Sequence, residues 1–384
     1  MVSRTDRSAF SEWWWTVDRY LLVVLVGLMV GGVVLSLAGS PPVAERLGLD
    51  SFHFAKRHIA FFLPSVVLMI AVSFLTPRQV RRVSLIVFVT MVVLMLATLF
   101  VGDEIKGARR WITVGAFSLQ ASEFAKPAFV VLTAWLFAEA GRQTDIPANL
   151  FAVLLLAIVG ALLVAQPDFG QTLLVAIAWG ALFFLSGVSW RWIVGVLGVA
   201  AAGIAAAYST MPHVAMRIDR FLNPQGGDTY QIDTALNSFL AGGWFGQGPG
   251  EGVVKRVLPD SHTDFIFAVA AEEFGIVVCL LLVAAFAFVV VRGFSYSLKD
   301  EDPFTRLAVA GLTILFGVQS VINMAVNLNL MPAKGMTLPF ISYGGSSMLA
   351  LGLQMGFLLA LTRHRRQRFQ PADRFVYPAG WRAG

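Results

Sequence analysis

The sequence predicts an all-α polytopic integral membrane protein, with about ten transmembrane helices and a large extracytoplasmic loop between helices 7 and 8. Hydrophobic residues make up 57% of the 384 residues and charged residues only 14%, whereas soluble domains carry roughly 25% charged residues. The apolar residues gather in blocks of about 20, the length that an α-helix needs to cross about 30 Å of hydrocarbon. These observations exclude an ordinary soluble enzyme.

Ten apolar blocks follow one another along the chain, and we expect one membrane-spanning helix in each. An even number of crossings places both termini on the same side of the membrane. We interpret residues 1–384 as a single membrane domain, and the first block as a retained span because further spans follow it. The blocks cover about residues 20–39, 58–75, 83–101, 127–140, 148–165, 171–187, 192–208, 265–291, 304–326 and 345–362.

The distribution of Lys and Arg predicts the orientation of the chain. If the N-terminus is cytoplasmic, the inner segments hold 17 of the 29 basic residues and the outer segments hold 12, as the positive-inside rule requires. Residues 1–19 are then a cytoplasmic tail and residues 363–384 a basic cytoplasmic tail. Residues 209–264 form a large periplasmic loop, whose Gly, Pro and Trp content favours a folded, turn-rich segment.

Composition also excludes several classes of function. The only cysteine, Cys279, lies in an apolar block, so the chain has no disulfide framework and no cysteine-based metal site. The five His residues lack the spacing of a zinc hydrolase, and the chain has no ATP-binding P-loop motif. The net charge of +6 fits membrane orientation and anionic lipid rather than nucleic acid.

Asp264 is the first candidate for chemistry, because it ends the large loop where the next span begins. A carboxylate at the boundary between membrane and water can accept a proton as a general base. The alternative is that Thr263 or Asp264 simply caps the following helix. On one continuous helix Glu272 would flank the face of Asp264, and Glu273 would lie on the opposite face.

A second group of candidates precedes and opens the fourth span. Arg109 and Arg110 beside Trp111 suit a pyrophosphate headgroup, because guanidinium groups bind phosphate in a bidentate fork. Interfacial snorkelling is the alternative for both residues. Glu123 and Lys126 lie three residues apart, so they can form an ion pair on one helical face, which favours a structural role.

Two further outer segments carry candidate residues. Asp168 lies in a Pro-Asp-x-Gly sequence that is equally typical of a turn. Residues 332–347 combine Pro and Gly between the last two spans, and such irregular backbone near membrane depth requires a protein or water-filled surrounding. Basic and acidic residues of these segments could line one external cavity for a substrate with an anionic headgroup and a lipid tail.

The motifs in these segments resemble the SEDS family (shape, elongation, division and sporulation), and more closely its division branch than its elongation branch. They are GARRWI (107–112), ASEFAKP (121–127), QPDFGQ (166–171), LPDSHTDFIFAVAAEEFG (258–275) and PAKGMTLPFISYGGSS (332–347). The resemblance runs from the first span to the last. It places the essential acid of the family on Asp264, its Glu-x-x-Lys on Glu123 and Lys126, and its loop lysine on Lys334.

The resemblance implies a peptidoglycan glycosyltransferase of the cytoplasmic (inner) membrane that polymerises lipid II during septal cell-wall synthesis. Its partners would be a class B penicillin-binding protein, an FtsI-like transpeptidase, and other division proteins. The alternatives are a lipid II flippase, which would need polar groups leading to the cytoplasmic side, and a scaffold that only recruits partners.

In the mechanism that we expect, Asp264 removes the proton from the 4-hydroxyl of the acceptor sugar. That hydroxyl attacks C1 of the donor and displaces undecaprenyl pyrophosphate with inversion, forming a β-1,4 bond. A divalent cation, Mg²⁺ or Mn²⁺, is the only cofactor considered, and its ligands are unknown. The candidates for binding the pyrophosphate or the headgroup are Arg109, Arg110, Lys126, Lys334, Glu123, Asp168, His262 and Ser342.

Overall fold

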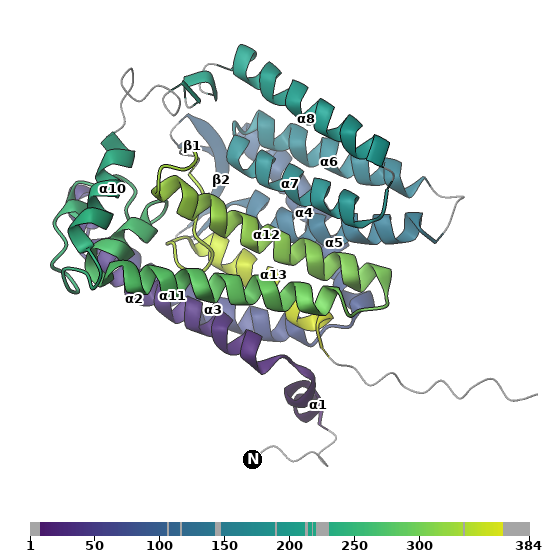
Figure 1. Cartoon of the computed structure of the whole chain (residues 1–384), viewed down its shortest axis with the longest axis horizontal. Coiled ribbons are helices and arrows are strands. Elements are labelled where there is room, and N and C mark those ends of the chain that lie inside the picture. The colour runs from purple at the N-terminus through teal and green to yellow at the C-terminus, as the bar shows by residue number, and fades with distance from the viewer. Residues whose placement is uncertain are drawn as a thin grey trace, which may run out of the picture.

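The computed structural model describes residues 8–105, 107–115, 117–142, 147–188, 190–211, 214–216, 218–219, 230–332 and 335–363. In these ranges ten apolar helices cross the molecule (Figure 1), which confirms the predicted number and order. Eight are long and apolar enough to span a membrane, and α7 and α13 are shorter. The ten are α2 (Arg19–Arg46), α3 (His53–Ser73), α4 (Pro77–Val101), α5 (Ala121–Ala140), α6 (Ala148–Ala165), α7 (Phe169–Leu185), α8 (Trp190–Thr210), α11 (Ile266–Ser297), α12 (Pro303–Asn327) and α13 (Gly345–Leu361).

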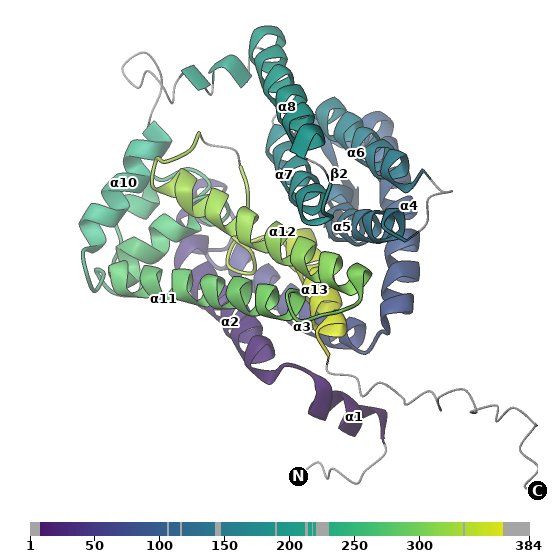
Figure 2. The ribbon, with the colours of Figure 1, turned by 45° about the vertical axis from the view of Figure 1, so that its right-hand side comes forward.

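The helices α5, α12 and α13 form the centre of the bundle. In α5 83% of the most apolar stretch is buried inside the protein, and in α12 67%. A helix that is apolar on every side is stable in the middle of a bundle, where neighbours cover all its faces. By contrast, α4 and α6 are mostly exposed, and α8 lies at the edge beside α6 and α7 (Figure 2). These outer helices present the apolar surface expected to face lipid.

The first and last described segments of the chain lie at the same end of the helix bundle. The short helix α1 (Ala9–Thr16) precedes α2, and its Trp13 donates a hydrogen bond to Ser73 Oγ at 2.7 Å. Arg363, which follows α13, donates to Thr16 Oγ1 at 3.0 Å. The structure thus adds a helix to the predicted tail 1–19, while residues 1–7 and 364–384 of the two tails lie outside the described residues.

The predicted large loop contains further structure in its described part. It holds the helix α10 (Tyr230–Gly242) and the 3-10 helix η2 (Val254–Arg256), and α10 packs against α11. Glu272 accepts hydrogen bonds from the backbone N–H groups of Val254 and Lys255 at 2.6 and 2.7 Å. Glu273 forms a buried ion pair with the Lys255 side chain. Both acids therefore anchor the loop to the bundle.

A small antiparallel sheet lies in the connection between α4 and α5, where the sequence predicts no strands. Its strands β1 (Asp103–Ile105), β2 (Ala108–Val114) and β3 (Phe117–Leu119) are paired in the order β1-β2-β3. In the pair β2–β3, Ile112 lies opposite Leu119 and Val114 opposite Phe117. Strands this short give a weak periodic pattern in sequence, and the connection looks like an ordinary loop.

Gly275 interrupts α11, and its replacement tests how the loop is fixed to the bundle. Its φ of 79° and ψ of 176° are accessible essentially to glycine alone, and a β-carbon there would overlap the carbonyl oxygen of Trp244. We expect Gly275→Ala to lower the free energy of unfolding by about 1–3 kcal/mol from backbone strain, with the overlap adding to this. Unfolding in mixed detergent micelles measures the loss. Gly180→Ala in α7, where a β-carbon meets no atom within 4 Å, is the control. Equal stability of the two variants would contradict the expectation.

Candidate functional site

Asp264 lies in a tight turn that immediately precedes α11, and it is half-buried. The carbonyl oxygen of Asp260 accepts the backbone N–H groups of Thr263 and Asp264 at 3.0 and 3.1 Å. The residue that caps α11 is Phe265, and no side chain makes a capping hydrogen bond there. The alternative that Thr263 or Asp264 caps this helix is therefore wrong. The predicted placing of Glu272 and Glu273 relative to Asp264 does not apply either. Asp264 precedes the helix, which begins at Ile266.

Two buried asparagines of α12 hold the backbone of Asp264 in place. Asn323 and Asn327 donate from their Nδ2 atoms to the carbonyl oxygen of Asp264 at 3.0 and 2.9 Å. The Oδ1 atom of Asn327 also accepts the backbone N–H of Ala268 at 3.1 Å. The turn is thus fixed through its main chain.

The irregular segment between α12 and α13 borders the same carboxylate. A β-carbon on Gly335, whose φ is 61°, would lie 3.3 Å from Oδ2 of Asp264. The carbonyl oxygen of Met336 accepts a hydrogen bond from Asn323 Nδ2 at 2.6 Å. Ser342 donates to the carbonyl oxygen of Thr263 at 2.5 Å and accepts the N–H of Leu338 at 2.7 Å. Its hydroxyl therefore joins this segment to the Asp264 turn. Lys334 lies outside the described residues.

Glu123 and Lys126 form a buried polar cluster with two glutamines. The Nζ atom of Lys126 lies 3.0 Å from Glu123 Oε1, 2.8 Å from Gln171 Oε1 and 3.3 Å from Gln319 Oε1. Gln171 Nε2 donates to Glu123 Oε1 at 2.7 Å. Only 3% of the Lys126 side chain and 5% of the Glu123 side chain are exposed. The predicted ion pair is present, and it is buried inside the bundle between α5, α7 and α12.

The Lys126 cluster is connected to the Asp264 turn through α12. Gln319, Asn323 and Asn327 are spaced by four residues, so they share one face of the helix. Gln319 Nε2 donates to the carbonyl oxygen of Thr337 at 3.1 Å. Thr337 follows Met336, whose carbonyl oxygen binds Asn323. Sequence analysis did not identify these three amides. Their regular spacing within an otherwise apolar span is the signal that could have identified them.

Arg110 and Asp168 bind each other at the ends of β2 and α7. Arg110 Nη1 lies 3.3 Å from Asp168 Oδ2, and its other nitrogens donate to the carbonyl oxygens of Gln166 and Pro167. Asp168 also caps α7 by accepting the N–H of Gln171 at 3.2 Å. Burial raises the pKa of the Asp168 carboxyl, and the Arg110 charge opposes this shift. Arg109, in contrast, is exposed and lies 3.5 Å from Glu104.

His262 is buried in an aromatic cluster beside the Asp264 turn. Its ring centroid lies 4.4 Å from that of Phe54 and 5.5 Å from that of Tyr343. The backbone N–H of Tyr343 donates to the carbonyl oxygen of His262 at 2.9 Å. His262 therefore positions the turn from the side of α3.

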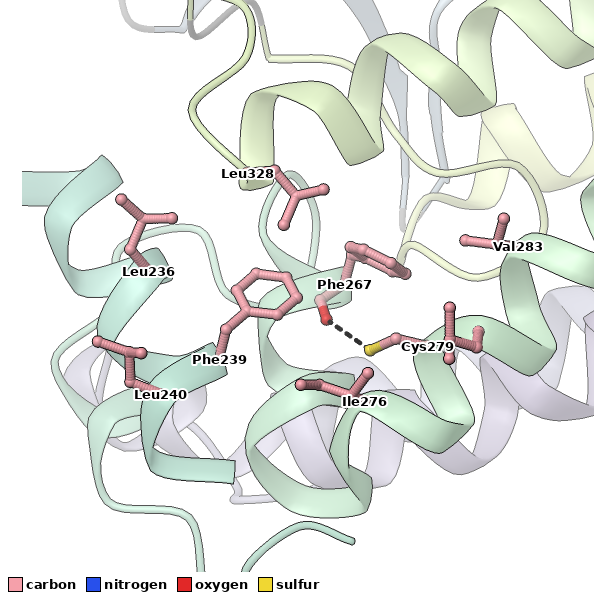
Figure 3. A pocket seen from close by; sticks show the side chains of 9 residues that line it. Leu236, Phe239, Leu240, Phe267, Ile276, Cys279, Val283 and Leu328 are labelled. Atoms are coloured by element: carbon pink, nitrogen blue, oxygen red, sulfur yellow. Dashed lines mark hydrogen bonds between the residues drawn. The ribbon is translucent and has the colours of Figure 1, made fainter. Parts of the chain in front are cut away.

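An apolar groove of about 520 Å³ opens close to the Asp264 turn (Figure 3). Two of its lining residues are close in sequence to the site. Phe267 lies three residues after Asp264, and Leu328 lies one residue after Asn327. Its other walls come from α10 and α11, and its lining carries no charged side chain. The groove suits hydrocarbon and cannot by itself bind a sugar or a pyrophosphate.

The arrangement gives one half-buried carboxylate a fixed position at one end of a membrane bundle. The backbone of its turn is held by two amides and one hydroxyl, and a glycine leaves room beside it. Such a carboxylate is suited to accept a proton from a hydroxyl group that reaches this end of the bundle.

Comparisons with known proteins identify the family of the chain. A family model described as "Cell cycle protein", of the FtsW, RodA and SpoVE proteins, matches residues 18–367. The chain is 50% identical over 376 residues to the probable peptidoglycan glycosyltransferase FtsW of Caulobacter vibrioides, covering 98% of this chain and 96% of that protein. It is 34% identical to the FtsW protein of Alkalilimnicola ehrlichii, covering 96% and 94%.

Two solved structures share the fold. One belongs to a peptidoglycan synthase complex that coordinates polymerisation and crosslinking, with a TM-score of 0.74 and 28% identity over 90% of this chain and 97% of that one. The other is the rod-shape-determining protein RodA of Thermus thermophilus, with a TM-score of 0.67 and 26% identity over 92% and 99%. The match over almost the whole length of the chain, together with its ten helices and its motifs, shows that it belongs to the SEDS family and is FtsW-like.

Proposed function

We propose that this chain is a peptidoglycan glycosyltransferase that polymerises lipid II, and that Asp264 is its general base. The observation that carries the proposal is the half-buried carboxylate of Asp264, which lies beside Gly335 on a turn whose backbone is fixed. The names of the relatives, which are glycosyltransferases, support the same reaction. They favour it over the transport of lipid II across the membrane.

In the reaction, Asp264 takes the proton from the 4-hydroxyl of the acceptor sugar as the oxygen attacks C1 of the donor sugar. The bond from C1 to the pyrophosphate oxygen breaks, and undecaprenyl pyrophosphate leaves with the bonding electron pair. General-base catalysis of this kind contributes about 10²–10⁴ in rate. Holding two lipid-anchored substrates at one end of the bundle supplies a further contribution from orientation.

The leaving pyrophosphate needs positive charge near it. Arg109 is exposed, and its ion pair is with the exposed Glu104. The hydrogen bonds of Arg110 and Lys126 to other groups of the protein give these two residues a positioning role. Lys334, in the same segment as Gly335, is the remaining candidate. A divalent cation would add charge neutralisation at the leaving group when bound.

We propose that such a cation would bind together with substrate. They contain no group of three or more His, Cys, Asp or Glu side chains placed to bind a metal ion. Magnesium often binds through one or two carboxylates and the phosphates of its substrate. One oxygen of Asp264 and the pyrophosphate would be its ligands, which leaves the second carboxylate oxygen for the proton.

We assign the end of the bundle that contains Asp264 to the periplasmic side. The opposite end holds basic residues, among them Arg78, Arg81, Arg142 and Arg363, as expected for the cytoplasm. In this orientation lipid II is polymerised outside the inner membrane, at the division septum. A class B penicillin-binding protein would crosslink the strands, in keeping with the complex to which the structural neighbour belongs.

The test of this function is the purified chain incubated with lipid II in detergent, with and without the transpeptidase partner. Glycan strands separated on a gel are the expected product. Lipid II that stays intact under both conditions would refute the proposed activity.

Removal of the Asn327 side chain tests the positioning of Asp264. We expect Asn327→Ala to lower the polymerisation rate at least about tenfold, because the Asp264 carbonyl loses one donor and the Ala268 N–H loses its acceptor. Each lost hydrogen bond of this kind costs about 1–3 kcal/mol. Because Asn327 supports the backbone of Asp264 and Ala268 and is not one of the groups proposed to bind substrate, kcat should fall while KM stays within a few fold. An unchanged kcat in a folded Asn327→Ala variant would show that Asn327 does not position the base.

A further inference from the structure

A second hollow lies at the end of the bundle opposite to Asp264. Helix α12 connects the two places, because Asp302 caps its beginning and Asn327 lies at its end. With 25 residues the helix is about 37 Å long. The hollow has a volume of about 420 Å³, and its lining is formed by Thr76, Pro77, Arg78, Arg81, Arg142, Asp302 and Phe304.

The lining carries more positive than negative charge. Three guanidinium groups face one carboxylate, that of Asp302, and this carboxylate already has its partners. Its Oδ1 atom accepts from Arg142 Nη2 at 2.7 Å, and its Oδ2 atom accepts from the N–H and hydroxyl of Thr305 at 3.1 and 2.9 Å. Among the lining residues that the structure describes, no further carboxylate pairs with Arg78 and Arg81.

Arg81 is held in position by aromatic rings rather than by an acid. Its guanidinium carbon lies 5.1 Å from the ring centroid of Phe304 and 5.6 Å from that of Trp135. Among the described residues, neither Arg78 nor Arg81 forms an ion pair. A guanidinium that lies over aromatic rings and forms no ion pair can still donate its N–H groups to a ligand, and these groups match the oxygens of a phosphate.

An apolar stripe on α4 continues from these arginines along the outside of the bundle. Leu85 and Val89 follow Arg81 at intervals of four residues, and their side chains are 49% and 53% exposed. Ile86 and Val93, 67% and 59% exposed, extend the stripe. A phospholipid has the same order of features, with a charged headgroup at the interface and hydrocarbon below it.

We propose that this hollow binds the phosphate of an anionic phospholipid, with Arg78 and Arg81 bearing the headgroup and the α4 stripe contacting an acyl chain. The site is separate from the Asp264 end, and the proposal does not depend on the glycosyltransferase reaction. The bound lipid would lie in the membrane leaflet that surrounds the basic end of the bundle.

Native mass spectrometry of the full chain in detergent, with phosphatidylglycerol or phosphatidylcholine added, tests the proposal. We expect the chain to retain phosphatidylglycerol in preference to phosphatidylcholine. The double variant Arg78→Ala/Arg81→Ala should bind phosphatidylglycerol at least about tenfold more weakly, because both groups that would donate charge-assisted hydrogen bonds to the phosphate are removed. Arg82→Ala is the matched control, since Arg82 lies next to Arg81 on α4 and is exposed but does not line the hollow. It should bind the lipid as the parent does.

Several outcomes would overturn the proposal. Equal losses in Arg82→Ala and in the double variant would mean that binding follows surface charge and not the hollow. Displacement of the lipid by millimolar inorganic phosphate would identify a free-phosphate site instead. If the alanine double variant does not fold, Arg78→Lys/Arg81→Lys keeps the charge and removes the planar fork. Undiminished lipid binding by a folded lysine variant would then contradict the role given to the guanidinium groups.

Discussion

Asp264→Asn is expected to abolish lipid II polymerisation while the protein remains folded. The substitution removes the basic oxygen but keeps the size of the side chain and the backbone carbonyl that Asn323 and Asn327 bind. Loss of a general base lowers the rate by about 10²–10⁴, which would bring glycan synthesis below detection on a gel. The measurement is the yield of glycan strands from purified parent and variant at equal concentration, with equal thermal stability confirmed first.

The matched control for this variant is Asp260→Asn. It makes the same chemical change four residues earlier in the same turn, at a backbone φ of 49° that asparagine adopts readily. We expect it to retain polymerisation within a few fold of the parent. Normal strands from Asp264→Asn, or equal losses in both variants, would show that Asp264 is not the base.

Lys126→Met is expected to have the largest effect on stability. The lysine neutralises Glu123 inside the bundle, where their side chains are 3% and 5% exposed. Removal of one partner of a buried ion pair costs about 3–5 kcal/mol, because the remaining charge stays buried without compensation. Gln171 and Gln319 each lose a donor in addition. The free energy of unfolding in mixed micelles measures the effect.

The control for Lys126→Met removes the opposite charge as well. In Glu123→Gln/Lys126→Met no net charge is buried, and the new glutamine can still accept the hydrogen bond that Gln171 Nε2 donates to Glu123. We expect the double variant to recover most of the lost stability. If the single and double variants were equally unstable, packing rather than charge would explain the loss. A single variant as stable as the parent would refute the structural role of the pair.

The sequence predicted the helices well because membrane spans have a strong signal. Each of the ten apolar blocks contains a helix, and their alternation brings Thr16 and Arg363 together at one end. The sheet β1–β3 was missed, since its strands are short and lie in a polar connection. The helix α1 was missed because eight residues with three tryptophans look like an interfacial anchor.

The candidate site was predicted in part. Asp264 was singled out because it ends the large loop at the membrane boundary, and Glu123 and Lys126 because they lie three residues apart. The structure connects them through α12. The partners on α12, Gln319 and Asn323, are uncharged and were not identified. A pattern of residue types also cannot give the direction of a side chain. Ser342 and Arg110 donate to the protein's own backbone, which the sequence did not predict. Their binding of substrate stays a prediction.

The most direct test of the account is an experimental structure of the chain with a lipid II analogue bound as acceptor. The account predicts that the 4-hydroxyl oxygen of the acceptor sugar lies about 2.6–3.2 Å from a carboxylate oxygen of Asp264, a distance at which proton transfer can occur. It also predicts that the sugar passes beside Gly335. A bound disaccharide whose hydroxyl groups all lie beyond the reach of Asp264, even through one water molecule, would contradict the assignment of the base.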